Sequence, residues 1–439
     1  MGWGAALAAA AAVWAGAQDA PVRTDSEPVP DEMIEEEARA SASSKEKSAS
    51  GAEGESDGVG EGDEAGTGGS GTPLEHPPKK DFDALGVPLV SFNSDLGWGI
   101  GLVGGGYFYD PRYTPYRHAL AAQSYFTTRG VQNHWLRYDG PDLLGKARLE
   151  VRAEFRRELF APFYGVGNLS GEGFVESGGQ DRGWSFDHFF PGGWARIRTK
   201  PGGKSHPLEL WGGYGFNWVR VTPYDESQLR AEAPRGLSGG AHARVLFGVA
   251  HDTRDFEADP TRGGVEEVAV RLSAQPLGSR YAYGGVTLSE RRFFSLGTPR
   301  VVLAQRLVLD VLFGEVPFFE WANVGGMQGG EGVGGMSTVR GVPRNRYQGN
   351  IKAISNTELR FYVFDFKLLG EKVKTGGVVY WDMGRVWHPG VDDGPWHQWH
   401  PGVGAGLRLA RRAAVVRFDY AVATENLRQG IYITFGHMF

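Results

Sequence analysis

A ten-residue stretch of strict alternation constrains the fold of this 439-residue chain more than any other feature. From Ala147 to Arg156 the odd positions are apolar and the even positions are all charged. A period of two places these two sets of side chains on opposite faces of a β-strand. The polar face of a soluble strand is rarely charged throughout, whereas a wall between lipid and a wet lumen alternates in this way. The stretch therefore predicts one strand of a transmembrane β-barrel.

Similar segments recur between turn signals along the rest of the chain. We expect sixteen of them, at residues 87–93, 97–109, 115–127, 131–139, 145–157, 184–198, 206–222, 238–252, 264–275, 280–291, 299–312, 350–366, 373–387, 401–411, 413–421 and 430–439. A tilted strand needs about 9–11 residues to span a bilayer, and most of these segments are long enough. The predicted fold class is all-β: a closed sixteen-stranded antiparallel transmembrane β-barrel with both chain ends of the barrel on the periplasmic side.

The composition agrees with a barrel. The chain has 67 Gly, 13 Trp, 16 Tyr and 25 Phe, as expected for many tight turns and for aromatic girdles at the membrane interfaces. After the N-terminal segment, no window approaches the ~20 apolar residues of a spanning helix. Cysteine is absent, which excludes disulfide staples.

The N-terminal part divides into two expected segments. Residues 4–15 are apolar and lead into Ala15-Gly16-Ala17, a small-x-small cleavage pattern, so residues 1–17 are expected to be a signal peptide; a short buried helix is the alternative. Residues 18–84 are expected to be a disordered, acidic, Gly/Ser-rich periplasmic linker, because they hold too few large apolar side chains to form a core. The barrel is expected at residues 85–439.

The charge of the chain is distributed unevenly. Of its 52 acidic and 46 basic side chains, residues 1–72 hold 15 and 4, which leaves 37 acidic and 42 basic in the rest. An acidic tail is thus attached to a mildly basic body. The tail is either a solubilising linker or a segment that docks on a periplasmic partner.

The last expected strand carries a closing-strand signal. Ile431, Ile433, Phe435 and Phe439 fall on one face of an alternating segment, and the sequence stops at an aromatic residue. A terminal Phe in this position resembles the signal by which outer-membrane barrels are recognised for insertion. We therefore expect Phe435 and Phe439 to form that signal.

The longest Gly-rich loop contains the triplet Val339-Arg340-Gly341, which resembles a motif of the BamA/TamA superfamily of outer-membrane barrels, the bacterial surface antigen family. Members of that family carry this motif at the tip of the sixth external loop, which folds back into the lumen. Val342 stands where the family often has Phe or Tyr. The resemblance implies a long loop folded into the lumen of this barrel.

Two further patterns support the resemblance. Asn356-Thr357-Glu358-Leu359-Arg360 matches a Glu-x-Arg pattern, and Tyr380-Trp381-Asp382-Met383-Gly384 matches an aromatic-x-Asp-x-Gly pattern. Alternation alone directs Glu358 and Asp382 into the lumen. We expect Arg340 to pair with both carboxylates and thereby to lock the loop, because a guanidinium can make charge-assisted, bidentate hydrogen bonds with them.

A third pattern lies upstream, where His251-Asp252-Thr253-Arg254-Asp255 is followed by Pro260 and by Arg262-Gly263. It matches a hairpin that is common in the family, with Asp252, Arg254, Asp255 and Gly263 as its motif residues. The resemblance covers about residues 85–439 and is strongest in the second half.

The resemblance implies a function without establishing it. Insertases of the superfamily carry periplasmic polypeptide-transport-associated domains, and residues 18–84 are too polar to form one, so the chain looks like a member without them. We expect a Gram-negative outer-membrane protein that assists insertion or translocation of polypeptides. The alternatives are a passive channel or structural barrel without assembly activity, and a scaffold whose acidic tail binds a periplasmic partner.

The expected partners follow from this interpretation. They are outer-membrane lipid and lipopolysaccharide, unfolded outer-membrane or secreted polypeptides, and a periplasmic partner of the acidic linker, but no nucleic acid. No motif selects a catalytic set, so no enzyme activity is expected. No cofactor or metal is expected either: the Gly clusters lack the Lys-Ser/Thr of a phosphate loop, and His397 and His400 fall in an aromatic loop.

Overall fold

The computed structural model describes residues 81–439, except for residues 111, 114–115, 144, 146, 172–180, 204, 328, 369–370 and 412–413. The expected signal peptide at 1–17 and the expected linker at 18–84, apart from its last four residues, lie outside the described residues. The first strand begins at Phe82, three residues before the expected start of the barrel at residue 85.

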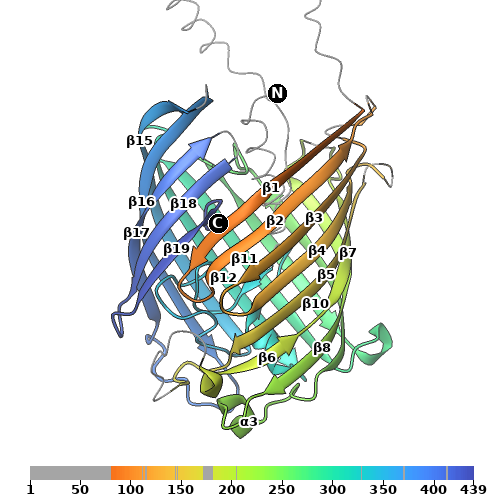
Figure 1. The fold of residues 1–439 in the computed structure, drawn as a ribbon, viewed down its shortest axis with the longest axis vertical. Coiled ribbons are helices and arrows are strands. Elements are labelled where there is room, and N and C mark those ends of the chain that lie inside the picture. The colour runs from red at the N-terminus through yellow and green to blue at the C-terminus, as the bar shows by residue number, and fades with distance from the viewer. Residues whose placement is uncertain are drawn as a thin grey trace, which may run out of the picture. The chain divides into compact units, whose positions relative to one another are not determined.

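The described residues form a closed antiparallel β-barrel, whose strands tilt across the wall (Figure 1). Seventeen strands make one sheet, and two of them share one position in the wall, which leaves sixteen positions as predicted. The wall strands are β1 (Phe82–Asn93), β2 (Gly97–Phe108), β3 (His118–Thr127), β4 (Val131–Gly140), β5 (Ala147–Pro162), β6 (Ser185–Phe189), β7 (Gly192–Thr199), β8 (Leu208–Pro223), β9 (Gly240–Asp252), β10 (Gly263–Ser273), β11 (Tyr283–Ser295), β12 (Val301–Gly314), β15 (Ile351–Leu368), β16 (Glu371–Trp387), β17 (His400–Arg411), β18 (Ala414–Ala423) and β19 (Gln429–Phe435).

The segment expected as one strand at 184–198 is two strands, β6 and β7, which both lie between β5 and β8. The interruption falls at Phe190 and Pro191. Proline has no N–H to donate to a ladder, and the pairing of β5 with β6 shifts its register between Glu158 and Ala161. A proline and a bulge therefore split a strand that alternation alone leaves continuous.

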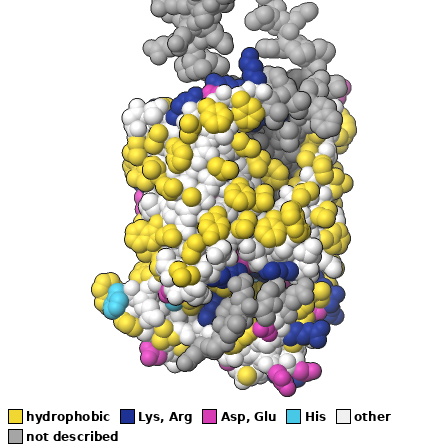
Figure 2. All heavy atoms as spheres, turned by 60° about the vertical axis from the view of Figure 1, so that its left-hand side comes forward, with side chains coloured by type: hydrophobic (Ala, Val, Ile, Leu, Met, Phe, Trp, Pro, Cys, Tyr) yellow, Lys and Arg dark blue, Asp and Glu magenta, His cyan; other side chains and the backbone are white. Residues whose placement is uncertain are grey.

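The predicted alternation across the wall is confirmed by the burial of neighbouring side chains. On β12, Leu307 and Leu309 are 46% and 39% exposed, whereas Arg306 and Asp310 are 9% and 0% exposed. Figure 2 shows hydrophobic side chains spread over the outer surface of the strands, with charged side chains gathered toward the two ends. The apolar face is the lipid-facing surface of a membrane barrel and the charged face lines its lumen.

Short helices and turns occupy the connections. They are η1 (Arg182–Trp184), α3 (Gln228–Glu232), η2 (Gln275–Leu277) and α4 (Phe318–Trp321), and a small hairpin of β13 (Asn323–Val324) and β14 (Gly330–Glu331) follows α4. Within the described part of the chain, no helix is long and apolar enough to cross a membrane.

The barrel closes where β1 meets β19, a boundary that we call the seam. β1 pairs with β2 through twelve residues but with β19 through only two, Phe92 with Ile433 and Asn93 with Tyr432. One further main-chain hydrogen bond joins Ser94 N to Ile431 O at 3.0 Å. The seam is therefore paired only next to the β1–β2 turn. That end of the barrel is called the loop end here, and the end where β1 begins is called the terminus end.

The last strand is shorter than the predicted segment 430–439. β19 ends at Phe435, and Gly436 has a φ of +78°, which favours glycine. The chain then turns inward, since the Phe439 ring lies 6.4 Å from that of the buried Phe293. The expectation that Phe439 continues the outer face of Phe435 is wrong, because the chain turns at Gly436.

Candidate functional site

The connection between β12 and β15, residues 315–350, folds into the lumen from the loop end. It packs against the wall in a cluster of buried apolar residues, which comprises Val308, Val324, Val333, Val339, Val342, Tyr347, Ile354, Val386 and Ala423. Five of these belong to the loop and the others to β12, β15, β16 and β18. Burial of this apolar surface fixes the course of the loop along the wall.

The tip of the loop is the triplet Val339-Arg340-Gly341. Val339 is fully buried in the apolar cluster and Arg340 is also 0% exposed. Gly341 has a φ of +92°, and a Cβ atom there would lie 2.6 Å from Ala423 N. Only glycine can make this close approach to β18.

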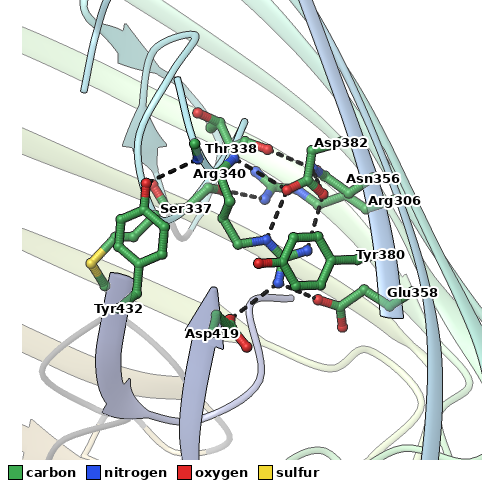
Figure 3. A network of polar contacts seen from close by, with 12 residues as sticks. Arg306, Ser337, Thr338, Arg340, Asn356, Glu358, Tyr380, Asp382, Asp419 and Tyr432 are labelled. Atoms are coloured by element: carbon green, nitrogen blue, oxygen red, sulfur yellow. Dashed lines mark hydrogen bonds and ion pairs between the residues drawn. The ribbon is translucent and has the colours of Figure 1, made fainter. Parts of the chain in front are cut away.

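The guanidinium of Arg340 lies among three carboxylates of the wall (Figure 3). Its Nε and Nη2 donate to the two oxygens of Asp382 at 2.7 and 3.0 Å, which is a bidentate contact. Its Nη1 lies 2.8 Å from Glu358 and 3.2 Å from Asp419. The guanidinium carbon also lies 3.3 Å from the centre of the Tyr380 ring. One buried cation thus joins β15, β16 and β18.

Neighbouring groups hold these carboxylates in position. Asn356 Nδ2 donates to Asp382 Oδ1 at 2.9 Å and to the carbonyl of Thr338 on the loop at 2.5 Å. Arg360 Nε donates to Glu358 at 2.8 Å, and Arg408 Nη1 donates to Asp419 at 2.5 Å. Glu358 and Asp419 therefore each have a second arginine, whereas the only arginine that contacts Asp382 among the described residues is Arg340.

The structure brings Arg340, Glu358 and Asp382 together and adds two groups that sequence reasoning did not assign to the site. Asp419 alternates with the apolar residues Phe418 and Tyr420 in the expected strand at 413–421, and Tyr380 belongs to the aromatic-x-Asp-x-Gly pattern. Neither could be connected with Arg340, because the spatial register of β18 and β16 relative to the loop depends on tertiary pairing.

The loop tip also contacts both sides of the seam. The Tyr432 hydroxyl on β19 accepts a hydrogen bond from Gly341 N at 3.0 Å. Asp95, next to β1, accepts from Arg344 N at 3.2 Å and from Arg428 Nη2 at 2.9 Å. Arg428 Nη1 in turn donates to the carbonyl of Gly341 at 2.8 Å. The loop therefore bridges the seam at the loop end, where the two strands are paired.

The expected hairpin residues lie at the terminus end and do not meet Arg340. Arg254 donates to both oxygens of Asp252 at 3.0 and 2.7 Å, and Asp255 accepts from the backbone N–H of Thr261 at 2.9 Å. Gly263 has a φ of +84°. These contacts are local, so the four residues shape the turn between β9 and β10.

The inward-turned C-terminal segment contacts the same turn. His437 Nε2 lies 2.9 Å from Asp259 Oδ1, and Arg360 Nη2 donates to the main-chain oxygen of Phe439 at 3.0 Å. Arg360 also lies over the Phe439 ring, 5.0 Å from its centre. Residues 436–439 are therefore held inside the barrel. Phe435, by contrast, lies on β19 and Phe439 does not, so the two residues of the expected closing-strand signal are separated.

The fold and this site together define a class of protein: an outer-membrane β-barrel whose long loop is anchored in the lumen by a buried arginine. A family model described as the Omp85 superfamily domain matches residues 194–439. This is more than half of the chain, and the chain belongs to the Omp85 superfamily. Omp85 barrels are generally non-enzymatic and lie in the Gram-negative outer membrane, which is therefore the location of this protein.

Solved structures show the same fold. BamA from Haemophilus ducreyi lacking POTRA domains 1–3 matches with a TM-score of 0.57 and 15% identity, over 82% of this chain and 70% of that chain. CdiB from Escherichia coli matches with a TM-score of 0.54 and 15% identity, over 82% of this chain and 63% of that chain. A comparison with curated proteins gives no match.

Proposed function

We propose that this barrel assists the insertion or translocation of polypeptides at the outer membrane, and that the seam is where it acts. The observation that carries the proposal is the unequal pairing of β1, with twelve residues on β2 and two on β19. Residues 82–91 of β1 are not paired with any residue of β19. This edge lies in the wall of a membrane barrel.

An unpaired strand edge in a membrane favours the addition of another strand. Backbone N–H and C=O groups without a partner cost several kcal/mol each in hydrocarbon. They are also a template for pairing with an extended segment of another chain. A client strand that pairs with β1 would satisfy these groups while it enters the membrane.

We also propose a role for the loop in this activity. Through Gly341 and Arg344 the loop tip contacts Tyr432 on β19 and Asp95 beside β1, and Arg340 anchors the tip to three other wall strands. The anchored loop would hold the seam together at the loop end while the rest remains free to open. Breaking the anchor would then affect the seam as well as the loop.

The test is a disulfide across the seam between Phe92→Cys and Ile433→Cys, which are directly paired. Paired strand residues have Cα atoms about 4.5–5.5 Å apart, within the range that a disulfide spans. The chain has no native cysteine to interfere. The control is the same bridge between Leu407→Cys and Phe418→Cys, a direct pair of the closed wall between β17 and β18.

Both proteins are reconstituted in vesicles and tested for assembly of an unfolded outer-membrane barrel. We expect the oxidised seam bridge to block assembly, reduction to restore it, and the control bridge to have no effect. If the oxidised seam variant assembles clients at the rate of the control, or if no form of the protein accelerates assembly, the proposal is wrong. Large steady ion currents through both oxidised variants would favour a passive channel.

A further inference from the structure

A second feature of the lumen lies away from Arg340, against β5 to β9. It is a cavity of about 460 Å³, which we call the lumenal cavity. This volume is in the range of small-ligand sites. Part of its lining comes from Gly325, Gly326 and Met327, a segment that we call the first arm of the loop. The cavity therefore lies between the wall and this first arm.

The lining of the lumenal cavity has an excess of positive charge. Six arginines and four glutamates contribute to it: Arg152, Arg156, Arg196, Arg244, Arg271, Arg344, Glu154, Glu158, Glu320 and Glu331. The lumen of a barrel is wet, but a surplus of cations in a narrow space repels other cations and attracts anions. Arg196 and Arg271 also contact Glu150 and Asp310, which lie outside the lining. At the surface of the cavity itself arginines outnumber carboxylates, which favours an anionic solute.

Arginine N–H groups are prominent among the buried polar atoms of the lining without a partner, which also include Asn133 Oδ1 and His188 Nε2. Arg196 Nη2, Arg244 Nε and Arg271 Nε are buried and have no hydrogen-bond partner, although Arg271 Nε lies 3.9 Å from Glu320. Arg196 and Arg271 are 6% and 4% exposed. No carboxylate oxygen of the lining lacks a partner in this way. Buried polar groups normally have partners, so three unused guanidinium N–H groups at one cavity indicate a missing acceptor.

The strand register explains how the hollow arises between two of these arginines. Arg196 on β7 lies opposite Gly213 on β8, and Arg244 on β9 lies opposite Gly215 on β8. Both glycines line the cavity. Because neither has a side chain, the wall between the two guanidinium groups is open to a ligand.

The remaining contacts of these arginines hold them in place. Arg196 donates to Glu150 at 2.8 Å and to the carbonyl of Met327 at 2.6 Å. Arg244 donates to Glu320 at 2.8 Å and to Asn217 at 2.9 Å. A guanidinium fixed in this way loses little further entropy when a ligand binds, and its planar N–H groups match phosphate and carboxylate oxygens.

We propose that the lumenal cavity binds a small oxyanion, as free phosphate or as the phosphate group of a small organic solute. Arg196 and Arg244 supply hydrogen bonds to its oxygens, and Gly213 and Gly215 supply the space. Because Arg196 also donates to Met327, an anion in the cavity stabilises the first arm of the loop. This site is independent of the proposed function, which concerns the seam.

The test measures binding of radiolabelled inorganic phosphate to the purified full chain in detergent, at constant ionic strength maintained with chloride. Arg244→Gln removes the Nε donor of that arginine. Gly215→Leu fills the hollow without changing charge; the nearest atom to a Cβ there is Trp194 Cβ at 3.7 Å, so the site has room. Arg157→Gln is the control, because it removes an arginine that does not line the cavity.

We expect saturable binding by the native chain, at least tenfold weaker binding by Arg244→Gln and by Gly215→Leu, and no change in Arg157→Gln. If one cavity variant fails to fold, the other decides. Glycerol 3-phosphate is tested in parallel: tighter binding than phosphate assigns the site to an organic phosphate, and equal or weaker binding assigns it to the free ion. Absence of saturable binding, or equal binding by all four proteins, overturns the proposal.

Discussion

At the scale of single residues, Arg340 is the centre of the contacts that anchor the loop in the lumen. It is fully buried, and its guanidinium contacts Asp382, Glu358 and Asp419 while it stacks on Tyr380. A buried charge of this kind is not by itself evidence for stability, because desolvation opposes the ion pairs. Arg340 is important because its removal would leave buried carboxylates without this partner.

Arg340→Ala should loosen the loop. Removing one partner of a buried ion pair costs about 3–5 kcal/mol, which corresponds to loop opening on the order of a hundredfold or more. Limited proteolysis of residues 315–350 in the folded barrel measures this opening. Adding Asp382→Asn should restore part of the protection, because Glu358 and Asp419 keep Arg360 and Arg408. Wild-type protection in Arg340→Ala, or no rescue by the second change, would contradict the lock.

Part of this site could be predicted from the sequence. Alternation placed Glu358 and Asp382 on the lumenal face, and the loop motif singled out Arg340; in the structure the three lie within hydrogen-bonding distance. Asp419 was not found, because nothing local to β18 distinguishes it from other lumenal charges. The lumenal cavity could not be predicted either, since it depends on register across β7, β8 and β9.

At the scale of elements, the strands were predictable and their ends were not. Side-chain alternation specifies the faces of a wall strand because lipid and lumen impose opposite demands. It does not specify where pairing stops. Pro191 divides the expected segment 184–198, and Gly436 ends the last strand four residues before the expected position. Both deviations come from the backbone: Pro191 lacks an N–H, and Gly436 has a positive φ. The alternation of side chains does not reveal either property.

The C-terminal segment should respond to acid through His437. Burial, together with Arg360 and Arg408, lowers the pKa of His437 to about 4 although Asp259 opposes this shift. In a released segment the pKa of His437 returns to its ordinary value of 6.5. Between these values the released form binds a proton that the docked form does not, so docking weakens by about tenfold per pH unit as pH falls from 6.5 to 4.

Amide hydrogen exchange of residues 436–439 measures this release. In the docked form Asp259 stays ionised throughout that window. Burial raises its pKa, but the hydrogen bond from His437 and the charges of His437, Lys374 and Arg360 together lower it to about 2. Intrinsic amide exchange slows as pH falls, so the rates are corrected for it. We expect the protection of residues 436–439 to decrease as pH falls from 7.5 to 4.5. His437→Gln, which does not titrate, is the control. An identical pH response in the two proteins would show that His437 does not control docking.

At the scale of the whole molecule, the barrel combines a closed wall with one weak boundary. Among the described residues, fifteen of the sixteen boundaries between neighbouring wall positions are joined by more than two residue pairs, and the seam is joined by two. The loop anchored by Arg340 reaches this boundary and contacts both of its strands. A passive channel does not require such a boundary, whereas a protein that admits client strands to the membrane does. Membership of the Omp85 superfamily is consistent with either task.

The central claim, that the barrel handles polypeptides, is tested most directly by quantitative proteomics of the outer membrane in a strain depleted of this protein. Depletion is complemented by the native chain, by Arg340→Ala or by the control Arg157→Gln. We predict that other outer-membrane barrels, or one class of secreted protein, fall on depletion and under Arg340→Ala, and recover with the native chain and with Arg157→Gln. An unchanged outer-membrane proteome on depletion would contradict the claim and would favour a channel or a structural barrel.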